Sequence, residues 1–247
     1  LEVISRVAQA QIAETAAYLD STPIAVHCVD TPHIFDIQIT AFHGEDSAFV
    51  RIVDYHTNLV CIRRNGETLL EKECVTREDG LIGRSCLSVE GIVAFADTVN
   101  LGNVQEVLER QIAYNMDIAE EGLRGNYGAN IGSTILLGRE SDINCKMRAW
   151  AAAASDARMN GCEKPVVINS GSGNQGMTVS LPVIEFAKSL FCTEEQLYRA
   201  LVVSNLVAIH QKKYIGSLSA YCGAVSAACG SGAAITYLYG GSYEDIS

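Results

Sequence analysis

The chain has 247 residues, of which 48% are hydrophobic and 19% are charged, so its composition excludes an intrinsically disordered protein. The formal net charge of −11 at pH 7 argues against a nucleic-acid-binding surface and against docking on an anionic membrane. Both of those functions need a basic face. The length is enough for one large domain or two modest ones with a substantial core.

The first 75 residues predict a small α+β domain with an antiparallel sheet. Apolar residues at three- and four-residue spacing predict a helix over residues 4–19. Asn65-Gly66 lies between two strand-like runs and is a strong signal for a β-hairpin. The runs expected to form strands are residues 23–30, 33–42, 47–55 and 58–73.

A polar and aromatic group interrupts these strand-like runs at Asp54-Tyr55-His56-Thr57-Asn58. It has two interpretations, which the sequence leaves open. His56 and Asn58 would supply the hydrogen bonds of an ordinary turn. Alternatively, His56, Thr57 and Asn58 would be donors for a substrate carboxylate.

The rest of the chain predicts a linker over residues 76–87 and a mostly α-helical domain over residues 88–247. Ser88 opens the first expected helix, and Thr193 with Gln196 forms a capping box for a later one. Between them, an alanine-rich helix is expected with Ser141 as its N-cap and Gly161 as its stop.

The run EKPVVINSGSGNQG at residues 163–176 places a glycine-rich turn before a helix expected from Met177. Backbone N–H groups, hydroxyls and the helix dipole at such a turn favour an anion, either a carboxylate or a phosphate. The alternative is a tight polar loop whose serines cap the helix. The candidate binding residues are Ser170, Gly171, Ser172, Gly173, Asn174 and Gln175.

Residues 215–243 contain no Asp, Glu, Lys or Arg and consist mostly of Gly, Ala, Ser and Cys. Cys222 and Cys229 are seven residues apart and would share one face of a helix. This helix could be a buried packing element with thiols in the core, or it could bring a thiolate to a metal cluster. A membrane span is a third interpretation, which the poor hydropathy of the segment disfavours.

The preceding helix ends with His210, Lys212 and Lys213, where positive charge is favourable for the helix dipole. Lys213 could also meet a substrate anion. Nine cysteines without a CxxC pair predict free thiols in a reducing cytoplasm and no zinc finger. The carboxylates show no spacing that identifies a catalytic acid or base.

The combination of NSGSGNQG with KKYIGSLSAYCGAVSAACG resembles the serine dehydratase-like α-chain proteins, and most closely the group that includes the L-cysteine desulfidases. The tripeptide HTN, the run IAEEGLRGNYG and the run YLYGG are similar as well. The resemblance implies a [4Fe–4S] cluster held by three cysteines, with one iron open as a Lewis acid. It implies β-elimination from L-cysteine or L-serine, giving pyruvate and ammonia.

Carried onto this sequence, the resemblance assigns the first cluster ligand to Cys222 and leaves Cys229 as an expected core residue. It assigns the carboxylate and amino group of the substrate to the loop from Ser170 to Gln175. His56, Thr57 and Asn58 match a polar motif expected to face the same site.

The pieces of the family that would supply the other two cluster cysteines and a cysteine base are absent from the sequence. We therefore expect an internal portion of a longer protein, in which the catalytic base lies outside this chain. Alone, this chain is expected to hold no stable cluster and to have no activity. A non-catalytic protein that binds or senses an amino acid is the alternative. The expected partner is a small amino acid, and the sequence leaves a homodimer open.

Overall fold

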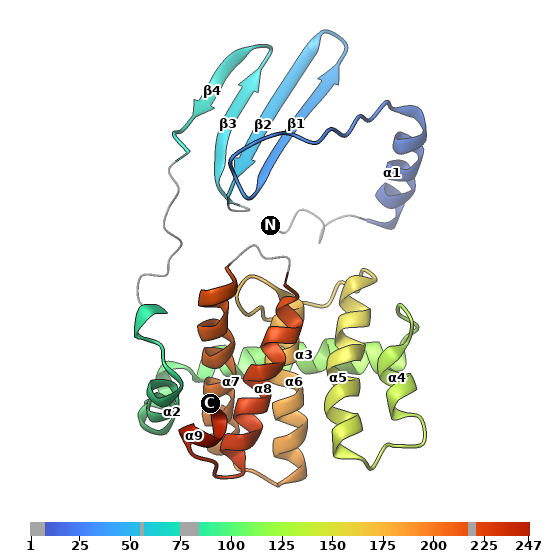
Figure 1. Cartoon of the computed structure of the whole chain (residues 1–247). Helices are drawn as coiled ribbons and strands as arrows, with labels where there is room; N and C mark the ends of the chain where they lie inside the picture. Colours follow the sequence, from blue (N-terminus) through green and yellow to red (C-terminus); the bar gives the residue numbers. More distant parts are fainter. Residues whose placement is uncertain (1–7, 55–56, 75–83, 217–220) are drawn as a thin grey trace. The chain divides into compact units, whose positions relative to one another are not determined.

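A computed structural model describes residues 8–54, 57–74, 84–216 and 221–247 (Figure 1). The chain divides into two compact units, which we call the first unit (residues 1–79) and the helical unit (residues 80–247). The first unit contains a four-stranded antiparallel sheet, and helices make up most of the second. The predicted α+β class is confirmed.

The first unit consists of one helix and a simple meander in which each strand pairs with the next. The segment from residue 23 to residue 30 forms no strand, so that prediction is wrong. Its large apolar side chains remain exposed, with Ile24 at 58%, Val26 at 90% and Val29 at 44%. The elements are α1 (Gln9–Ser21), β1 (Asp36–His43), β2 (Asp46–Val53), β3 (Leu59–Arg64) and β4 (Glu67–Glu71).

The predicted hairpin between β3 and β4 is confirmed. Asn65 (φ 51°) and Gly66 (φ 83°) are both left-handed, as a two-residue turn of this kind requires. The Asn65 side chain accepts from the Ser47 amide at 2.7 Å and donates to Asp46 at 2.6 Å. One residue therefore forms its own turn and ties it to the start of β2.

A partly buried ion pair joins β1 to β2. Asp36, whose side chain is 1% exposed, accepts hydrogen bonds from Arg51 at 2.6 and 3.0 Å. The Thr31 hydroxyl donates to the same carboxylate at 2.9 Å. The hydrogen bonds from Arg51 are the main cause that lowers the pKa of Asp36 to about 2. The carboxylate therefore stays charged at pH values well above 2.

Asp36→Asn should destabilise the first unit by about 2 kcal/mol at neutral pH. A lowered pKa gives stability that is complete above pH 4 and is lost as pH falls toward 2. The difference between wild type and variant should therefore shrink over that range. Hydrogen exchange of the β1 and β2 amides at several pH values measures it. A constant difference between pH 6 and pH 2.5 would contradict the assignment.

The helical unit has two main core clusters. The larger is formed by α2, α3, α6, α7 and α8, with Leu201 and Ile184 among its fully buried residues. The smaller joins α3, α5 and α6 around Ile118 and Met177. The helices are α2 (Val89–Thr98), α3 (Gln105–Arg124), α4 (Ile131–Leu136), α5 (Ile143–Met159), α6 (Gly173–Ser189), α7 (Glu194–Ile215), α8 (Gly223–Leu238) and α9 (Tyr243–Ile246), with 3-10 turns at Arg84–Cys86 and Leu101–Asn103.

Most of the predicted helix caps are confirmed. Ser88 caps α2, and Thr193 with Gln196 forms the capping box of α7. Ser141 is not the cap of α5, because the Asp142 carboxylate accepts from the amide of Asn144 at 2.8 Å. Gly161 follows the end of α5 with φ +85°, which favours glycine.

Helix α6 begins at Gly173, four residues before the predicted start, and runs through Pro182. Half of the glycine-rich turn is therefore the first turn of the helix. The backbone N–H groups of that turn lie at the N-terminal end of α6, where an anion is favoured.

Small residues let α8 approach α7 and α6 closely, as the packing interpretation of this segment predicts. A methyl group on Gly230 would lie 2.4 Å from the carbonyl oxygen of Ser204 on α7. The Ser204 hydroxyl in turn donates to the Val179 carbonyl of α6 at 2.6 Å. Cys229 is exposed, so its prediction as a core residue is wrong. In the described ranges, no helix combines the length and the hydropathy that a membrane span needs.

Gly230→Ala should destabilise the helical unit by about 1–3 kcal/mol, because the new methyl group meets a backbone carbonyl on α7. Gly232 is the matched control on the same helix. A methyl group there meets nothing within 4 Å, so Gly232→Ala should stabilise the unit by about 0.5–1 kcal/mol. Urea denaturation followed by fluorescence of the single tryptophan, Trp150, compares them. Equal effects of both substitutions would contradict the close approach.

Candidate functional site

The candidate site lies where α6 and α8 begin and α7 ends, which we call the α6–α8 end of the helical unit (Figure 1). The three helices contact one another. The N-cap residues Ser172 of α6 and Cys222 of α8 make no side-chain cap hydrogen bond to their helices. Neither N-cap side chain therefore occupies the first N–H groups of its helix, and the positive dipole end of each helix favours an anion there.

The glycine-rich loop and the start of α8 are in direct contact. A methyl group on Gly223 would lie 2.0 Å from Nε2 and 2.5 Å from Cδ of Gln175. The carboxamide of Gln175 therefore rests on the Gly223 backbone, next to Cys222. Two motifs separated by almost fifty residues of sequence meet here within one chain.

Backbone conformation explains the composition of the loop. Ser170 (φ 49°) and Gly171 (φ 87°) are both left-handed, between paired backbone hydrogen bonds of 3.1 Å that join Asn169 to Ser172. A methyl group on Gly173 would lie 2.4 Å from Nε of Arg158 on α5. The Arg158 guanidinium donates to Asn174 at 3.1 Å, which places a positive charge beside the start of α6.

A fully buried asparagine on α3 holds the loop to its helix. The Asn115 side chain accepts from the Val167 amide at 2.9 Å and donates to the Gly176 carbonyl at 3.1 Å and to Ser180 at 3.0 Å. A methyl group on Gly176 would lie 1.9 Å from the Val167 carbonyl oxygen. Asn115 thus fixes the segment before the loop against the first turns of α6.

A second group of amides fixes the start of the loop to α7. Asn169 donates to the side-chain oxygen of Asn205 at 3.0 Å, and Asn205 exchanges two hydrogen bonds with Gln111 at 2.9 and 3.1 Å. The Ser170 hydroxyl donates to Asn169 at 2.9 Å. Asn169 and Ser170 line a largely apolar cavity of about 340 Å³ between α3 and α7. Ser170 therefore belongs to this cavity, whereas Gln175 faces α8.

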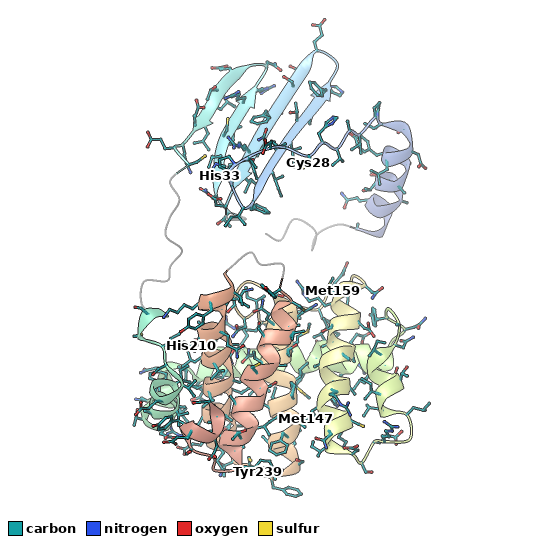
Figure 2. All side chains as sticks on the ribbon, in the orientation of Figure 1. Cys28, His33, Met147, Met159, His210 and Tyr239 are labelled. Atoms are coloured by element: carbon teal, nitrogen blue, oxygen red, sulfur yellow. The ribbon has the colours of Figure 1, made fainter. Side chains whose placement is uncertain are left out.

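The two lysines at the end of α7 differ in burial. Lys213, the predicted binding residue, is half-buried, and its ammonium lies 5.4 Å from the ring centre of Tyr214. Lys212 is only 5% exposed and was not predicted. Lys212 lies four residues after Ala208 and eight after Ser204, which are both buried. This spacing puts the three residues on one face of the helix and could have predicted that Lys212 is buried. His210 (Figure 2) stacks edge-on with Tyr214 and, two residues before Lys212, lies on the other side of α7.

The predicted binding residues of the first unit are His56, Thr57 and Asn58, and the structure gives no binding contact for them among the described residues. His56 lies outside the described residues. Thr57 is exposed, and the side chain of Asn58 donates to the Val53 carbonyl at 2.8 Å. That hydrogen bond is the turn role of the first interpretation. A role for these three residues in binding a substrate stays a prediction.

The metal-binding prediction depends on Cys222, which is exposed at the N-cap of α8. Within the described parts of the chain, no group of three or more His, Cys, Asp and Glu side chains gathers where it could hold a metal ion. One exposed thiol can provide one ligand. The described residues therefore do not fit a complete cluster site by themselves.

The whole chain, residues 1–247, matches the family model described as serine dehydratase alpha chain. The chain belongs to this family. It is 52% identical to a UPF0597 protein of Desulfitobacterium hafniense, 49% identical to one of Lachnoclostridium phytofermentans and 42% identical to one of Treponema denticola, each over the full chain. The chain spans 58–59% of the length of these relatives. No solved structure matches it.

Asn115→Ala should destabilise the helical unit by about 2–4 kcal/mol, because it leaves the Val167 amide without its partner, removes one hydrogen bond each from the Gly176 carbonyl and the Ser180 hydroxyl, and empties a fully buried position. Asn144→Ala on α5 is the matched control. Its side chain is exposed, so a change within about 0.5 kcal/mol is expected. Urea denaturation measures both, and a small effect at Asn115 would refute its holding role.

Proposed function

We propose that the full-length protein containing this chain catalyses β-elimination from a small L-amino acid, either L-cysteine or L-serine. The observation that carries the proposal is the contact of Gln175 with Gly223 in a chain of the serine dehydratase alpha chain family. This contact joins the glycine-rich loop to the helix that begins at Cys222. The role we assign to this chain is to bind the amino acid.

The reaction balances without an oxidant or a reductant. The substrate loses its α-proton and its β-substituent, so that L-serine releases water and L-cysteine releases hydrogen sulfide. The aminoacrylate that remains becomes an imine, and water hydrolyses the imine to pyruvate and ammonia. The enzyme must therefore orient the Cα–H bond and assist departure of the leaving group.

The residues of this chain suit the first of these tasks. The N–H groups at the starts of α6 and α8 can donate to a carboxylate, and their dipoles favour its charge. The fixed loop conformation holds these donors in place before the substrate arrives, which lowers the entropy cost of orientation. L-cysteine and L-serine share the carboxylate and the amine, so these donors suit either.

An iron–sulfur cluster is part of the proposal for the full-length protein. Its chemistry would be that of a Lewis acid on the leaving group. Cys222 is the ligand that this chain would provide. The remaining ligands and the catalytic base would come from the part of the longer relatives that this chain does not cover.

Anaerobically prepared full-length protein should release pyruvate from L-cysteine or L-serine. Cys222→Ser should lower kcat/KM at least 100-fold, whereas Cys229→Ser, within α8 and also exposed, should change it less than threefold. Coupled assays of pyruvate, ammonia and sulfide measure the activity.

Two outcomes would contradict the proposal. The absence of pyruvate from both substrates, with amino-acid binding intact, would favour a non-catalytic binding protein. Equal activity of the Cys222→Ser and Cys229→Ser variants would show that the start of α8 takes no part in the reaction.

A further inference from the structure

We propose that Lys212 is the charged anchor for the substrate carboxylate and that Gln175 shares this contact from the facing helix. The identity of the ligand as an amino acid rests on the proposed function. The position, burial and charge of Lys212 are properties of the structure itself.

Helix register places Lys212 at the α6–α8 end. Val179 of α6, Ala208 of α7 and Ala227 of α8 form one buried cluster between the three helices. One turn is four residues on the same helix face. Because α7 ends where α6 and α8 begin, one turn from this cluster toward the α6–α8 end leads to Gln175, Lys212 and Gly223.

The contact of Gln175 with Gly223 confirms that this layer exists. Lys212 is the α7 member of the same layer and is 5% exposed. Helix register therefore directs this side chain toward the starts of α6 and α8.

Neither Lys212 nor Gln175, which is also 5% exposed, has a side-chain hydrogen bond to another described residue. The ion pairs of the described residues do not include Lys212 either. Among the described residues, Nδ1 of His210 is the only fully buried side-chain N or O atom without a hydrogen-bond partner, so the polar ends of Lys212 and Gln175 keep some access to solvent. A ligand can therefore reach both groups and complete their hydrogen bonds.

The charge of this layer defines the ligand as an anion. The ammonium of Lys212 adds to the positive ends of the two helix dipoles, and Arg158 adds another charge beside Asn174. None of these groups is neutralised by a carboxylate of the described chain, although the protein carries a net charge of −11.

A carboxylate fits better than a larger anion for two reasons. The contact of Gln175 with Gly223 leaves little space between α6 and α8. The oxygen of the Gln175 carboxamide can also accept a hydrogen bond from an ammonium next to the carboxylate, which an α-amino acid has and a simple anion lacks.

Thermal denaturation and calorimetric titration of the 247-residue chain test the assignment at constant ionic strength. L-serine should raise the melting temperature of the wild type, whereas ethanolamine, which lacks the carboxylate, should not. Lys212→Met should weaken L-serine binding at least tenfold. The control Lys213→Met should change it less than threefold, because that ammonium lies against Tyr214.

The melting temperature without ligand provides a second readout. Lys212→Met replaces a charged side chain that has no ion pair in the described residues by an apolar one in a residue only 5% exposed, so it should melt at the same temperature as the wild type or higher. If the Lys212→Met variant does not fold, Gln175→Leu tests the α6 side of the same site. It should also weaken L-serine binding at least tenfold.

Unchanged L-serine binding in Lys212→Met would overturn the inference and leave the proposed function standing. Absence of L-serine binding by the wild type would overturn it too, as would an equal stabilisation by sulfate. Binding that depends on Lys212, together with full-length protein that releases no pyruvate, would overturn the proposed function and leave the inference standing.

Discussion

The close approach of α8 to α6 and α7 is the constraint on which the candidate site depends. Gly230 brings the backbone of α8 against the Ser204 carbonyl of α7. Gly223, at the start of α8, brings the backbone against the Gln175 side chain of α6. A side chain at either position would separate the helices. The composition of residues 215–243 is therefore explained by packing, and the packing in turn brings two helix N-termini to one place.

Positive charge makes the α6–α8 end suitable for an anion. The chain is strongly acidic as a whole, yet two helix N-termini, Lys212 and Arg158 lie around the α6–α8 end. Uncharged amides fix the surrounding backbone, with Asn115 on one side of the loop and Asn169 on the other. Holding the loop with neutral groups keeps the positive charge available for a ligand, since no carboxylate is needed to position it.

Much of the fold could be predicted because its signals are local. The Asn65-Gly66 turn and the Thr193 capping box are determined by a few adjacent residues. The strand prediction for residues 23–30 is wrong because a short apolar run forms a strand only when a neighbouring strand pairs with it and buries it. The predicted start of α6 is four residues late because glycine has a low helix propensity, which tertiary packing overrides here.

The candidate site could be predicted in part. Unusual composition and a family resemblance are visible in the sequence, and they make the glycine-rich loop and Cys222 candidates. The contact between them depends on how three helices cross, and so does the burial of Lys212 rather than Lys213. The sequence does not distinguish two adjacent lysines. The structure does, because Lys212 lies on the buried face of α7 and Lys213 does not.

The central claim is that the α6–α8 end binds the carboxylate of an amino acid, and a crystal structure of the chain with L-serine tests it most directly. The account predicts the carboxylate within hydrogen-bond distance of the Lys212 ammonium and of the first N–H groups of α6 or α8. Density for L-serine in the cavity between α3 and α7, with the α6–α8 end empty, would contradict it.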